Sequence, residues 1–340
     1  MVTWALAATG AWCAAQTAPA ENLRVVGGLA ALNQYTQYEE PFWLQELPRL
    51  TQGRATATIV PFDRAGLSGE EMLRVVQMGA VPFGTVLLSR SSAVEPELVG
   101  PDLAGLNPDF YAVRRSVAAY RPRLANLLRA RYGVELLAVY VYPAQVTFCA
   151  RPLASLADLA GRRVRVSSAS QADFVSALGA HPVQTAMNQV VPAIRNGTVD
   201  CAITGTMSGN TIGLHEVTSH VHTMAINWGL AAFVANGSAW LELSSSLRGV
   251  LERELPRLEQ RIWAESERET ADGLACNAGA PSCRGGRKGR MTLVAPTAAD
   301  EQRRIELLHQ VVVPAWVRRC GANCSTQWHQ TLAGPARPAR

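Results

Sequence analysis

Arg165 is the residue whose type and position in this sequence point most directly to chemistry. It lies within a short apolar strand expected over residues 163–166, between Val164 and Val166. Burying a guanidinium in such a strand without an anionic partner is costly. An arginine that faces a cleft from the carboxyl end of a strand can bind a carboxylate through two parallel hydrogen bonds. An internal salt bridge and a solvent-facing strand position are the alternatives.

A second polar cluster, His-Glu-Val-Thr-Ser-His-Val-His, spans residues 215–222. Its first two histidines, His215 and His220, are five residues apart and so do not share a helix face, as the zinc ligands of a metalloprotease helix would. We therefore expect the end of a helix near His220, then a strand, and no metal site.

The segment 205–211 follows a strand expected over 199–204 and contains glycines and hydroxyl side chains. Such a loop can direct N–H groups at an anion, but it lacks the Gly-Lys-Ser/Thr ending of a nucleotide-binding loop. The chain also lacks a Gly-x-Ser-x-Gly nucleophile elbow, and no set of serine, histidine and carboxylate stands out. We therefore expect no enzyme activity and no cofactor.

The composition limits the class of protein. The 340 residues are 48% hydrophobic and 17% charged, with a net charge of +5, which excludes disorder and indicates about two domains of roughly 150 residues. After the first twenty residues no long apolar run is free of charge, which excludes a polytopic membrane protein. Basic residues concentrate at 284–290 and 337–340, as in a solvated loop and terminus, so we expect no nucleic-acid partner.

The N-terminus indicates export. Residues 2–15 are almost wholly apolar, and an Ala-x-Ala cleavage site ends at Ala20. We interpret residues 1–20 as a signal peptide cleaved near Ala20 and place the protein in the periplasm, with a buried N-terminal helix as the alternative. No Lys or Arg precedes the apolar run, which is short, so the start codon can lie upstream.

Beyond that segment the cysteines are Cys149, Cys201, Cys276, Cys283, Cys320 and Cys324. An even number favours disulfides outside the cytoplasm. Cys276 and Cys283 bracket a turn-forming loop, and Cys320 and Cys324 bracket Gly-Ala-Asn, so each pair is a candidate local disulfide. The second pair also has a spacing that zinc would accept. The remaining two can pair only if their strands are neighbours.

Hydrophobic periodicity predicts alternating strands and helices. Strands are expected over 23–29, 55–60, 81–88, 134–142, 163–166 and 199–204, and helices over 39–50, 72–78, 109–131, 171–178, 188–195 and 247–274. The alternation occurs on both sides of Pro143 and implies two α/β units with parallel sheets. Gly133 is expected to end the third helix, and Pro256 to kink or divide the last one. Two such units and a long helix suggest a binding protein with a cleft.

Three blocks, LADLAGRRVRV (156–166), ALGAHPV (177–183) and AIRNGTVD (193–200), follow one another in a specific order and spacing. In this they resemble the solute-binding proteins of TRAP (tripartite ATP-independent periplasmic) transporters, the DctP-like family. The resemblance covers most of residues 23–274.

The resemblance implies an α/β protein of two lobes with a central cleft, connecting strands and a long lobe-spanning helix. Lobe I would comprise residues 22–143 and 231–270, and lobe II residues 144–230 and 271–340, which include a C-terminal extension. The lobes would close around a small organic acid and deliver it to the membrane permease subunits of a TRAP transporter.

The substrate-binding residues predicted from the resemblance are Arg165, Gln145, Met187, Thr204, Thr206 and Asn236. The first would be the carboxylate-binding arginine, and the last stands where the family has an asparagine. Gln145 replaces a basic residue found in many members, and Met187 an aromatic one. Thr204 and Thr206 replace amide side chains. These departures leave a monocarboxylate and a dicarboxylate equally open as the ligand.

The resemblance also places Cys149 and Cys201 in strands of the second lobe near the cleft floor, where a disulfide between them would stiffen that lobe. Two alternative functions remain at this level. One is a ligand sensor of the same fold that presents its closed form to a receptor, and the other is an exported α/β enzyme.

Overall fold

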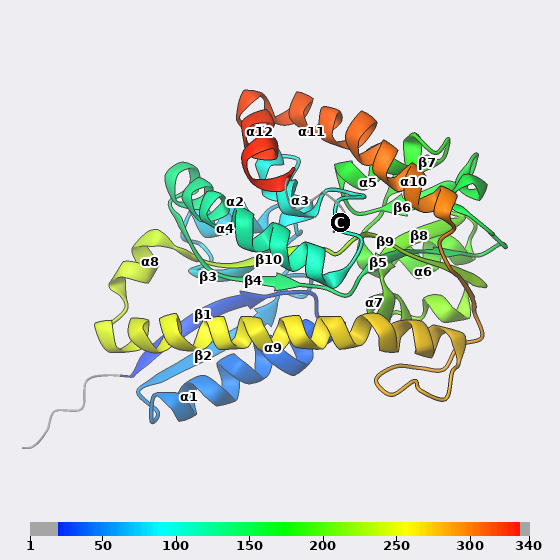
Figure 1. Ribbon diagram of the computed structural model, residues 1–340. Coiled ribbons are helices and arrows are strands. Elements are labelled where there is room, and N and C mark those ends of the chain that lie inside the picture. The colour runs from blue at the N-terminus through cyan, green and yellow to red at the C-terminus, as the bar shows by residue number, and fades with distance from the viewer. Residues whose placement is uncertain (1–19, 334–340) are drawn as a thin grey trace, which may run out of the picture.

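The computed structural model describes residues 20–333, so most of the predicted signal peptide, residues 1–19, lies outside the described residues. The strands form two sheets (Figure 1). In spatial order the first contains β2 (Ala55–Pro61), β1 (Glu21–Gly27), β3 (Phe83–Leu87), β10 (Leu230–Asn236) and β4 (Val134–Val141). The second contains β11 (Thr292–Val294), β9 (His220–Asn227), β5 (Gln145–Cys149), β8 (Cys201–Gly205), β6 (Arg163–Val166) and β7 (His181–Gln184). The predicted two-lobed α/β class is confirmed.

The chain passes between the sheets through two extended connections. β4 leads through Pro143 into β5, and β9 returns through Gly229 to β10. As a result β10 runs antiparallel to β3 and β4, and β5 runs antiparallel to β8 and β9. The prediction of wholly parallel sheets is wrong at these strands, because neighbouring strands become parallel only when a crossover such as a helix joins them. The pairs that do follow crossovers, such as β1 with β3 and β6 with β8, are parallel.

Helices cover both sheets. The helical segments before β8 are η1 (Gln34–Glu39), η2 (Phe42–Glu46), α1 (Leu47–Leu50), α2 (Met72–Gln77), α3 (Leu88–Ser91), η3 (Pro96–Asp102), α4 (Phe110–Tyr132), η4 (Leu156–Leu159), α5 (Ala169–Ser176), η5 (Met187–Gln189) and α6 (Val190–Arg195). Those after β8 are α7 (Thr206–Thr211), η6 (Leu214–Glu216), α8 (Gly237–Glu242), α9 (Ser245–Ala278), α10 (Ala298–Leu307), η7 (Leu308–Val312), α11 (Val313–Cys320), α12 (Ala322–Gln327) and η8 (Trp328–Leu332).

The ends of α4 follow from its sequence. The side chain of Asp109 accepts a hydrogen bond from the backbone N–H of Ala112 at 2.7 Å, which caps the first turn. Gly133 adopts a left-handed conformation with φ of 61° and ends the helix. The predicted helix over 109–131 and its end at Gly133 are confirmed.

The long helix α9 runs along both lobes (Figure 1). It passes through Pro256 without ending, so of the two expected outcomes there, a kink or a division, the division does not occur. Trp263 donates to a backbone carbonyl of β4 at 2.7 Å, which fixes the helix to the first sheet. Near its C-terminus Asn277 donates to the carbonyl of Thr206 at 3.0 Å, which fixes it to the second lobe. The predicted lobe-spanning helix is confirmed.

The C-terminal helices also contact both lobes. Asp300 of α10 accepts from the backbone N–H of Leu156 in the second lobe at 2.8 Å. Trp316 of α11 donates to the carbonyl of Pro96 in the first lobe at 2.7 Å. The residue boundaries predicted for the two lobes stay a prediction.

Three disulfides join the cysteines of the described chain: Cys149–Cys201, Cys276–Cys283 and Cys320–Cys324. The two local pairs were candidates from spacing alone. With its sulfurs bonded to each other, the last pair does not offer zinc two thiolates. Among residues 20–333, no helix combines the length and the apolar character that a membrane span requires.

Candidate ligand-binding cavity

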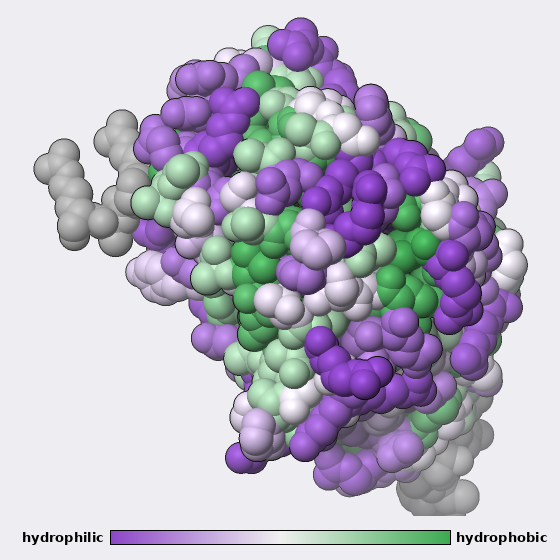
Figure 2. Space-filling view, turned by 90° about the vertical axis from the view of Figure 1, so that its right-hand side faces the viewer, coloured by the Kyte–Doolittle hydropathy of each residue, from purple (hydrophilic) through white to green (hydrophobic). Residues whose placement is uncertain are grey.

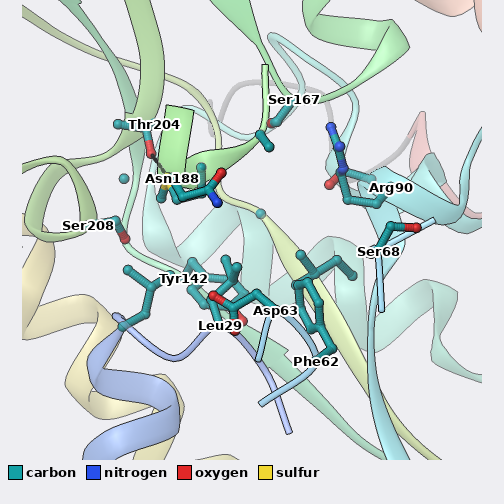
Figure 3. A pocket seen from close by; sticks show the side chains of 18 of the residues that line it. Leu29, Phe62, Asp63, Ser68, Arg90, Tyr142, Ser167, Asn188, Thr204 and Ser208 are labelled. Atoms are coloured by element: carbon teal, nitrogen blue, oxygen red, sulfur yellow. Dashed lines mark hydrogen bonds between the residues drawn. The ribbon is translucent and has the colours of Figure 1, made fainter. Parts of the chain in front are cut away.

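A cavity of about 270 Å³ opens between residues of the two lobes. Its walls come from the loops that follow β1, β2 and β3 in the first lobe, and from β5, β6, β8 and the start of α7 in the second. Figure 3 shows Thr204 and Ser208 on one side and Ser68 and Arg90 on the other. The carboxyl ends of strands are where open α/β sheets bind ligands, and the volume suits a small organic molecule.

Arg165 is buried at this cavity, with 5% of its surface exposed. Its Nε donates to the carbonyl of Thr185 at 3.0 Å and its Nη1 to the carbonyl of Ile203 at 2.8 Å, so two backbone bonds fix the guanidinium. No carboxylate within residues 20–333 forms an ion pair with it. Burial, helped by the positive charge of Arg90, lowers its pKa to about 10. The arginine is a positioned cation whose counter-ion the described chain does not supply.

Arg90 provides a second cation from the opposite lobe, and sequence reasoning missed it. It follows β3 directly and lines the cavity, where its Nη2 pairs with the Glu70 carboxylate at 2.5 Å. Its position just after an apolar strand was the available clue, because loops at the carboxyl ends of strands carry ligand-binding residues. Nothing in the sequence alone shows that this segment, which forms the short helix α3, faces Arg165.

Gln145 lines the cavity and is held by a chain of amides. Gln171 donates to the Gln145 side-chain oxygen and to the Asn227 side-chain oxygen, both at 2.7 Å. The Gln145 nitrogen has no hydrogen-bond partner among residues 20–333, which leaves its N–H groups for an acceptor in the cavity. Gly229 lies against it: its φ is +80°, and a Cβ there would come within 2.4 Å of that nitrogen. A side chain at position 229 would displace Gln145.

Asp102 secures the connection that passes between the lobes beside the cavity. Its carboxylate accepts from the Asn227 side chain at 2.9 Å, from the Trp228 N–H at 2.9 Å and from the Gly229 N–H at 2.8 Å. Burial raises its pKa to about 6, although the three donors favour the charged form. The link between β9 and β10, and with it the wall at Gly229, is therefore fixed from the first lobe.

Of the four other predicted residues, two lie at the cavity and two do not. Thr204 and Met187 both line it, and the Thr204 hydroxyl lies 3.9 Å from the Met187 sulfur. Thr206 is fully buried behind this wall, where its hydroxyl donates to the carbonyl of Glu269 at 3.1 Å. Its hydroxyl is used inside the protein, in the contact between α7 and α9.

Asn236 lies outside the lining residues of the cavity. Its side-chain oxygen accepts from the N–H groups of Ser238 at 3.1 Å and Ala239 at 3.2 Å, which caps α8. Its nitrogen donates to the carbonyl of Val76 at 3.0 Å. Leu230, at the other end of β10, is the part of that strand that lines the cavity. Asn236 joins α2 to α8 within the first lobe.

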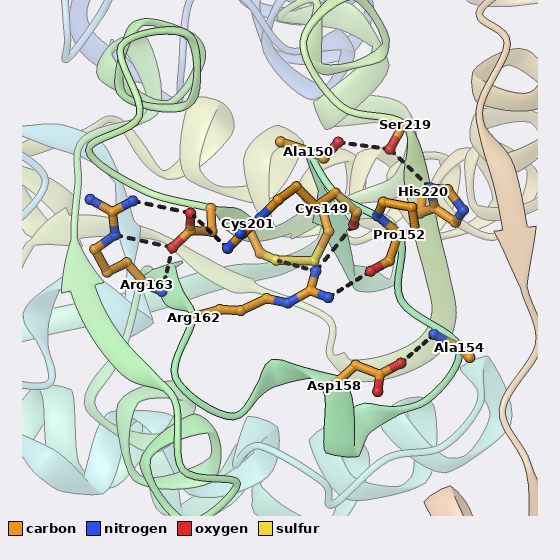
Figure 4. The surroundings of a disulfide bond; sticks show 12 residues. Cys149, Ala150, Pro152, Ala154, Asp158, Arg162, Arg163, Cys201, Ser219 and His220 are labelled. Atoms are coloured by element: carbon orange, nitrogen blue, oxygen red, sulfur yellow. Dashed lines mark hydrogen bonds and ion pairs between the residues drawn. A yellow bond between two sulfur atoms is a disulfide. The ribbon is translucent and has the colours of Figure 1, made fainter.

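Figure 4 shows the surroundings of the Cys149–Cys201 disulfide. The disulfide lies at the opposite end of its strands from the cavity. Gln145, at the start of β5, pairs with Gly205, and both line the cavity, whereas Cys149 pairs with Cys201 four residues further along. Four strand residues span about 13 Å. The expected position near the cleft floor is wrong, because β5 runs antiparallel to β8.

In the polar cluster 215–222 a helix is followed by a strand, as the sequence predicted. His215 lies in the short helix η6, and β9 begins at His220. His222 is buried, with its Nε2 3.4 Å from Asp300, and burial lowers its pKa. In the neighbouring segment 205–211, Gly205 ends β8 and the other residues form α7, whose Ser208 lines the cavity.

The fold and the cavity define a two-lobed ligand-binding protein with a cationic site between its lobes. The model of the bacterial extracellular solute-binding proteins, family 7, matches residues 31–275. The chain belongs to that family. By its description the family comprises solute-binding proteins that work outside the cytoplasm rather than enzymes.

Solved structures of such proteins share the fold. A Bordetella pertussis extracytoplasmic solute receptor that binds pyroglutamic acid is 23% identical, with a TM-score of 0.80 over 94% of this chain and 100% of that one. A TRAP periplasmic solute-binding protein from Desulfovibrio salexigens with bound orotic acid is 18% identical, with a TM-score of 0.80 over 92% and 99%. One from Shewanella oneidensis with bound succinate is 19% identical, with a TM-score of 0.76 over 94% and 100%.

Proposed function

We propose that this protein binds a small organic carboxylate in the cavity between its lobes and delivers it to the permease subunits of a TRAP-type transporter. The observation that carries this is Arg165: a buried guanidinium, fixed by two backbone carbonyls, with no carboxylate partner in residues 20–333. Burying a cation without a counter-ion costs free energy. A ligand carboxylate would remove that cost when it binds and would gain charge-assisted hydrogen bonds.

The other cavity residues fit the same ligand class. The free N–H groups of Gln145 and the hydroxyl of Thr204 can donate to a carboxylate or carbonyl oxygen, while Met187 offers an apolar surface. Arg90 adds a cation on the first lobe. Ligand contacts to both lobes would favour the closed form. The proposed contact set thus keeps Arg165, adds Arg90, and leaves out Thr206 and Asn236.

The proteins of similar fold support the ligand class. Pyroglutamic acid, orotic acid and succinate each carry at least one carboxylate. In line with the family, we place the mature protein in the periplasm, with a leader cleaved near Ala20.

A ligand screen with a matched pair of variants tests this function. The mature protein from Glu21 onward is heated with mono- and dicarboxylic acids, and with their uncharged amides as controls. A ligand at about one hundred times its Kd stabilises the folded state by about 2.7 kcal/mol, which raises Tm by a few degrees. We expect one class of acid to give this shift, its amide to give none, and Arg165→Gln to abolish it.

Arg163→Gln is the matched control. Arg163 is on the same strand, but it is exposed and pairs with Asp200, away from the cavity. This variant should keep the full ligand-induced shift. An equal shift in Arg165→Gln, or an amide that stabilises as well as its acid, would show that the site does not bind a carboxylate through Arg165.

A further inference from the structure

The segment 279–291, which joins α9 to β11, is a basic loop that the proposed function does not use. Its cations are Arg284, Arg287, Lys288 and Arg290, and all four are exposed. Residues 273–299 contain no aspartate or glutamate. The loop lies beyond the C-terminal end of α9, at the lower right of Figure 1. Hydrophilic side chains gather over the lower part of the face in Figure 2, which views the molecule from that side.

The protein holds the backbone of the basic loop in place. The buried carboxylate of Asp272 accepts from the N–H groups of Arg284 at 2.8 Å and Gly285 at 2.6 Å. The buried amide of Asn210 accepts from the Arg287 N–H at 2.7 Å and donates to its carbonyl at 2.8 Å. The Cys276–Cys283 disulfide closes the base of the loop. These contacts reach only the backbone, so they order the loop without neutralising its side chains.

The charges of the loop are largely uncompensated. Arg287 lies 3.7 Å from the Glu216 carboxylate, and both side chains are mostly exposed. Within residues 20–333 the side chains of Arg284, Lys288 and Arg290 form no ion pair. Glycines at 285, 286 and 289 separate the cations. The loop therefore presents a dense positive charge with little intervening side-chain surface.

We propose that the basic loop docks this protein on the anionic phospholipid surface of a membrane. Four closely spaced cations complement a diffuse layer of negative headgroups, which requires charge but no shaped pocket. An acidic protein surface is less favoured, since protein interfaces place aromatic or apolar anchors among their charges and the loop has none between Arg284 and Arg290. Each cation near such a membrane strengthens binding roughly fivefold.

Docking through the loop leaves the cavity free. Ser208 of α7 lines the cavity, whereas Asn210, two residues further on, holds the loop. The two sites thus use different sides of one helix. This proposal stands independently of the ligand assigned to the cavity.

Vesicle sedimentation tests the proposal with two variants of equal net charge. The loop variant changes all four loop cations to glutamine. The control variant makes the same change at four other exposed arginines that form no ion pair within the described residues, Arg24, Arg64, Arg74 and Arg195. The mature protein and both variants are incubated with vesicles of phosphatidylcholine alone or mixed with phosphatidylglycerol. Ligand-induced thermal shifts of the loop variant check that its cavity is intact.

We expect the wild type and the control variant to bind the anionic vesicles and the loop variant to bind at least tenfold more weakly. Raising the salt from about 0.05 M to about 0.5 M should release the wild type, because exposed charges are screened. Equal binding by the loop variant, equal binding to neutral vesicles, or no binding at all would overturn the proposal. So would binding that appears only when permease subunits are present in the vesicles, which would identify an acidic protein as the partner.

Discussion

The two ends of the strands β5, β6 and β8 show opposite chemistry. At the end away from the cavity, a disulfide joins β5 to β8, and Arg163 binds Asp200 with its Nε 3.0 Å from the carboxylate. At the cavity end, Arg165 is buried with no carboxylate partner in the described chain, and Gln145 keeps unused N–H groups. At the end away from the cavity, the protein itself supplies the partners of these side chains. At the cavity end, a bound ligand would supply them.

Arg163 and Arg165 show this difference between the two ends most directly. They are two residues apart on one strand and so share a face of the sheet. Hydrogen bonding to Asp200 raises the pKa of Arg163. Burial and the field of Arg90 lower the pKa of Arg165 to about 10. The same side chain is therefore stabilised as a cation at one position and destabilised at the next. An uncompensated buried charge is a mark of a binding site.

Removal of the Cys149–Cys201 disulfide should give the largest effect on stability. The disulfide closes a loop of 52 residues, so changing both cysteines to alanine should lower the free energy of unfolding by about 4 kcal/mol. Denaturant unfolding of the variant measures this. Because the disulfide lies away from the cavity, the ligand Kd measured by calorimetry should change less than about twofold. A large loss of affinity in the folded variant would show that the two ends are coupled.

Arg165→Gln should affect ligand binding and stability in opposite directions. Loss of a buried charge pair costs binding about 2–5 kcal/mol, so the Kd should rise roughly thirtyfold or more. Without ligand, the variant should be at least as stable as the wild type, since an uncompensated buried cation is removed. Arg163→Gln should instead lower stability slightly and leave the Kd unchanged. Calorimetry and thermal unfolding of both variants check the contrast, and a destabilised Arg165→Gln without ligand would contradict it.

Local features of the sequence predicted much of the fold. Asp109 and Gly133 mark the ends of α4 because capping and left-handed residues act within a few positions. Arg165 could be selected because a charge in an apolar strand is locally anomalous. In both cases the physical cause lies within the element itself.

Contacts between distant segments were not predictable in this way. The antiparallel direction of β5 depends on how the chain crosses between the lobes. Because of this direction, the disulfide lies at the far end of the strands and not at the predicted cleft floor. Arg90 lies close enough to lower the pKa of Arg165 only because of the arrangement of the two lobes. Asn236 matched a family position, but its contacts to Ser238 and Val76 show a structural use within one lobe.

Arg90→Gln should have a smaller effect and should sharpen the description of the ligand. If Arg90 binds a second anionic group, the Kd of a dicarboxylate should rise about tenfold, or about 1.4 kcal/mol, whereas that of a monocarboxylate should rise less than about threefold. Calorimetry with a matched pair of acids distinguishes these outcomes. Equal losses for both acids would place Arg90 and Arg165 on the same carboxylate.

Acid unfolding should respond to the Arg163–Asp200 pair and not to Arg165. This is the smallest effect we expect. Hydrogen bonding to Arg163 lowers the pKa of Asp200 below its usual 3.8. A carboxylate with a lowered pKa in the folded state stabilises the protein above its unfolded pKa and loses that contribution as the pH falls through the folded value. Arg163 is exposed to solvent, which screens the pair, so the contribution is small although Asp200 is half-buried. Asp200→Asn should therefore narrow the stability difference between pH 6 and about pH 3.

Arg165 cannot contribute to that acid change, because its pKa is about 10 and the group stays charged throughout the acidic range. At neutral pH the contribution of Arg165 to the free energy of unfolding also has the opposite sign to that of Asp200. A cation whose folded pKa is lowered destabilises the protein at neutral pH, and that cost is relieved only as the pH rises above about 10. Arg165→Gln should thus leave the acid limb unchanged and remove the gain in stability that deprotonation of Arg165 gives above about pH 10. Asp200→Asn should alter the acid limb and leave the alkaline limb unchanged. Urea unfolding of both variants across the pH range measures the two limbs. A change in the acid limb of Arg165→Gln would mean that Arg165 is paired with a carboxylate after all.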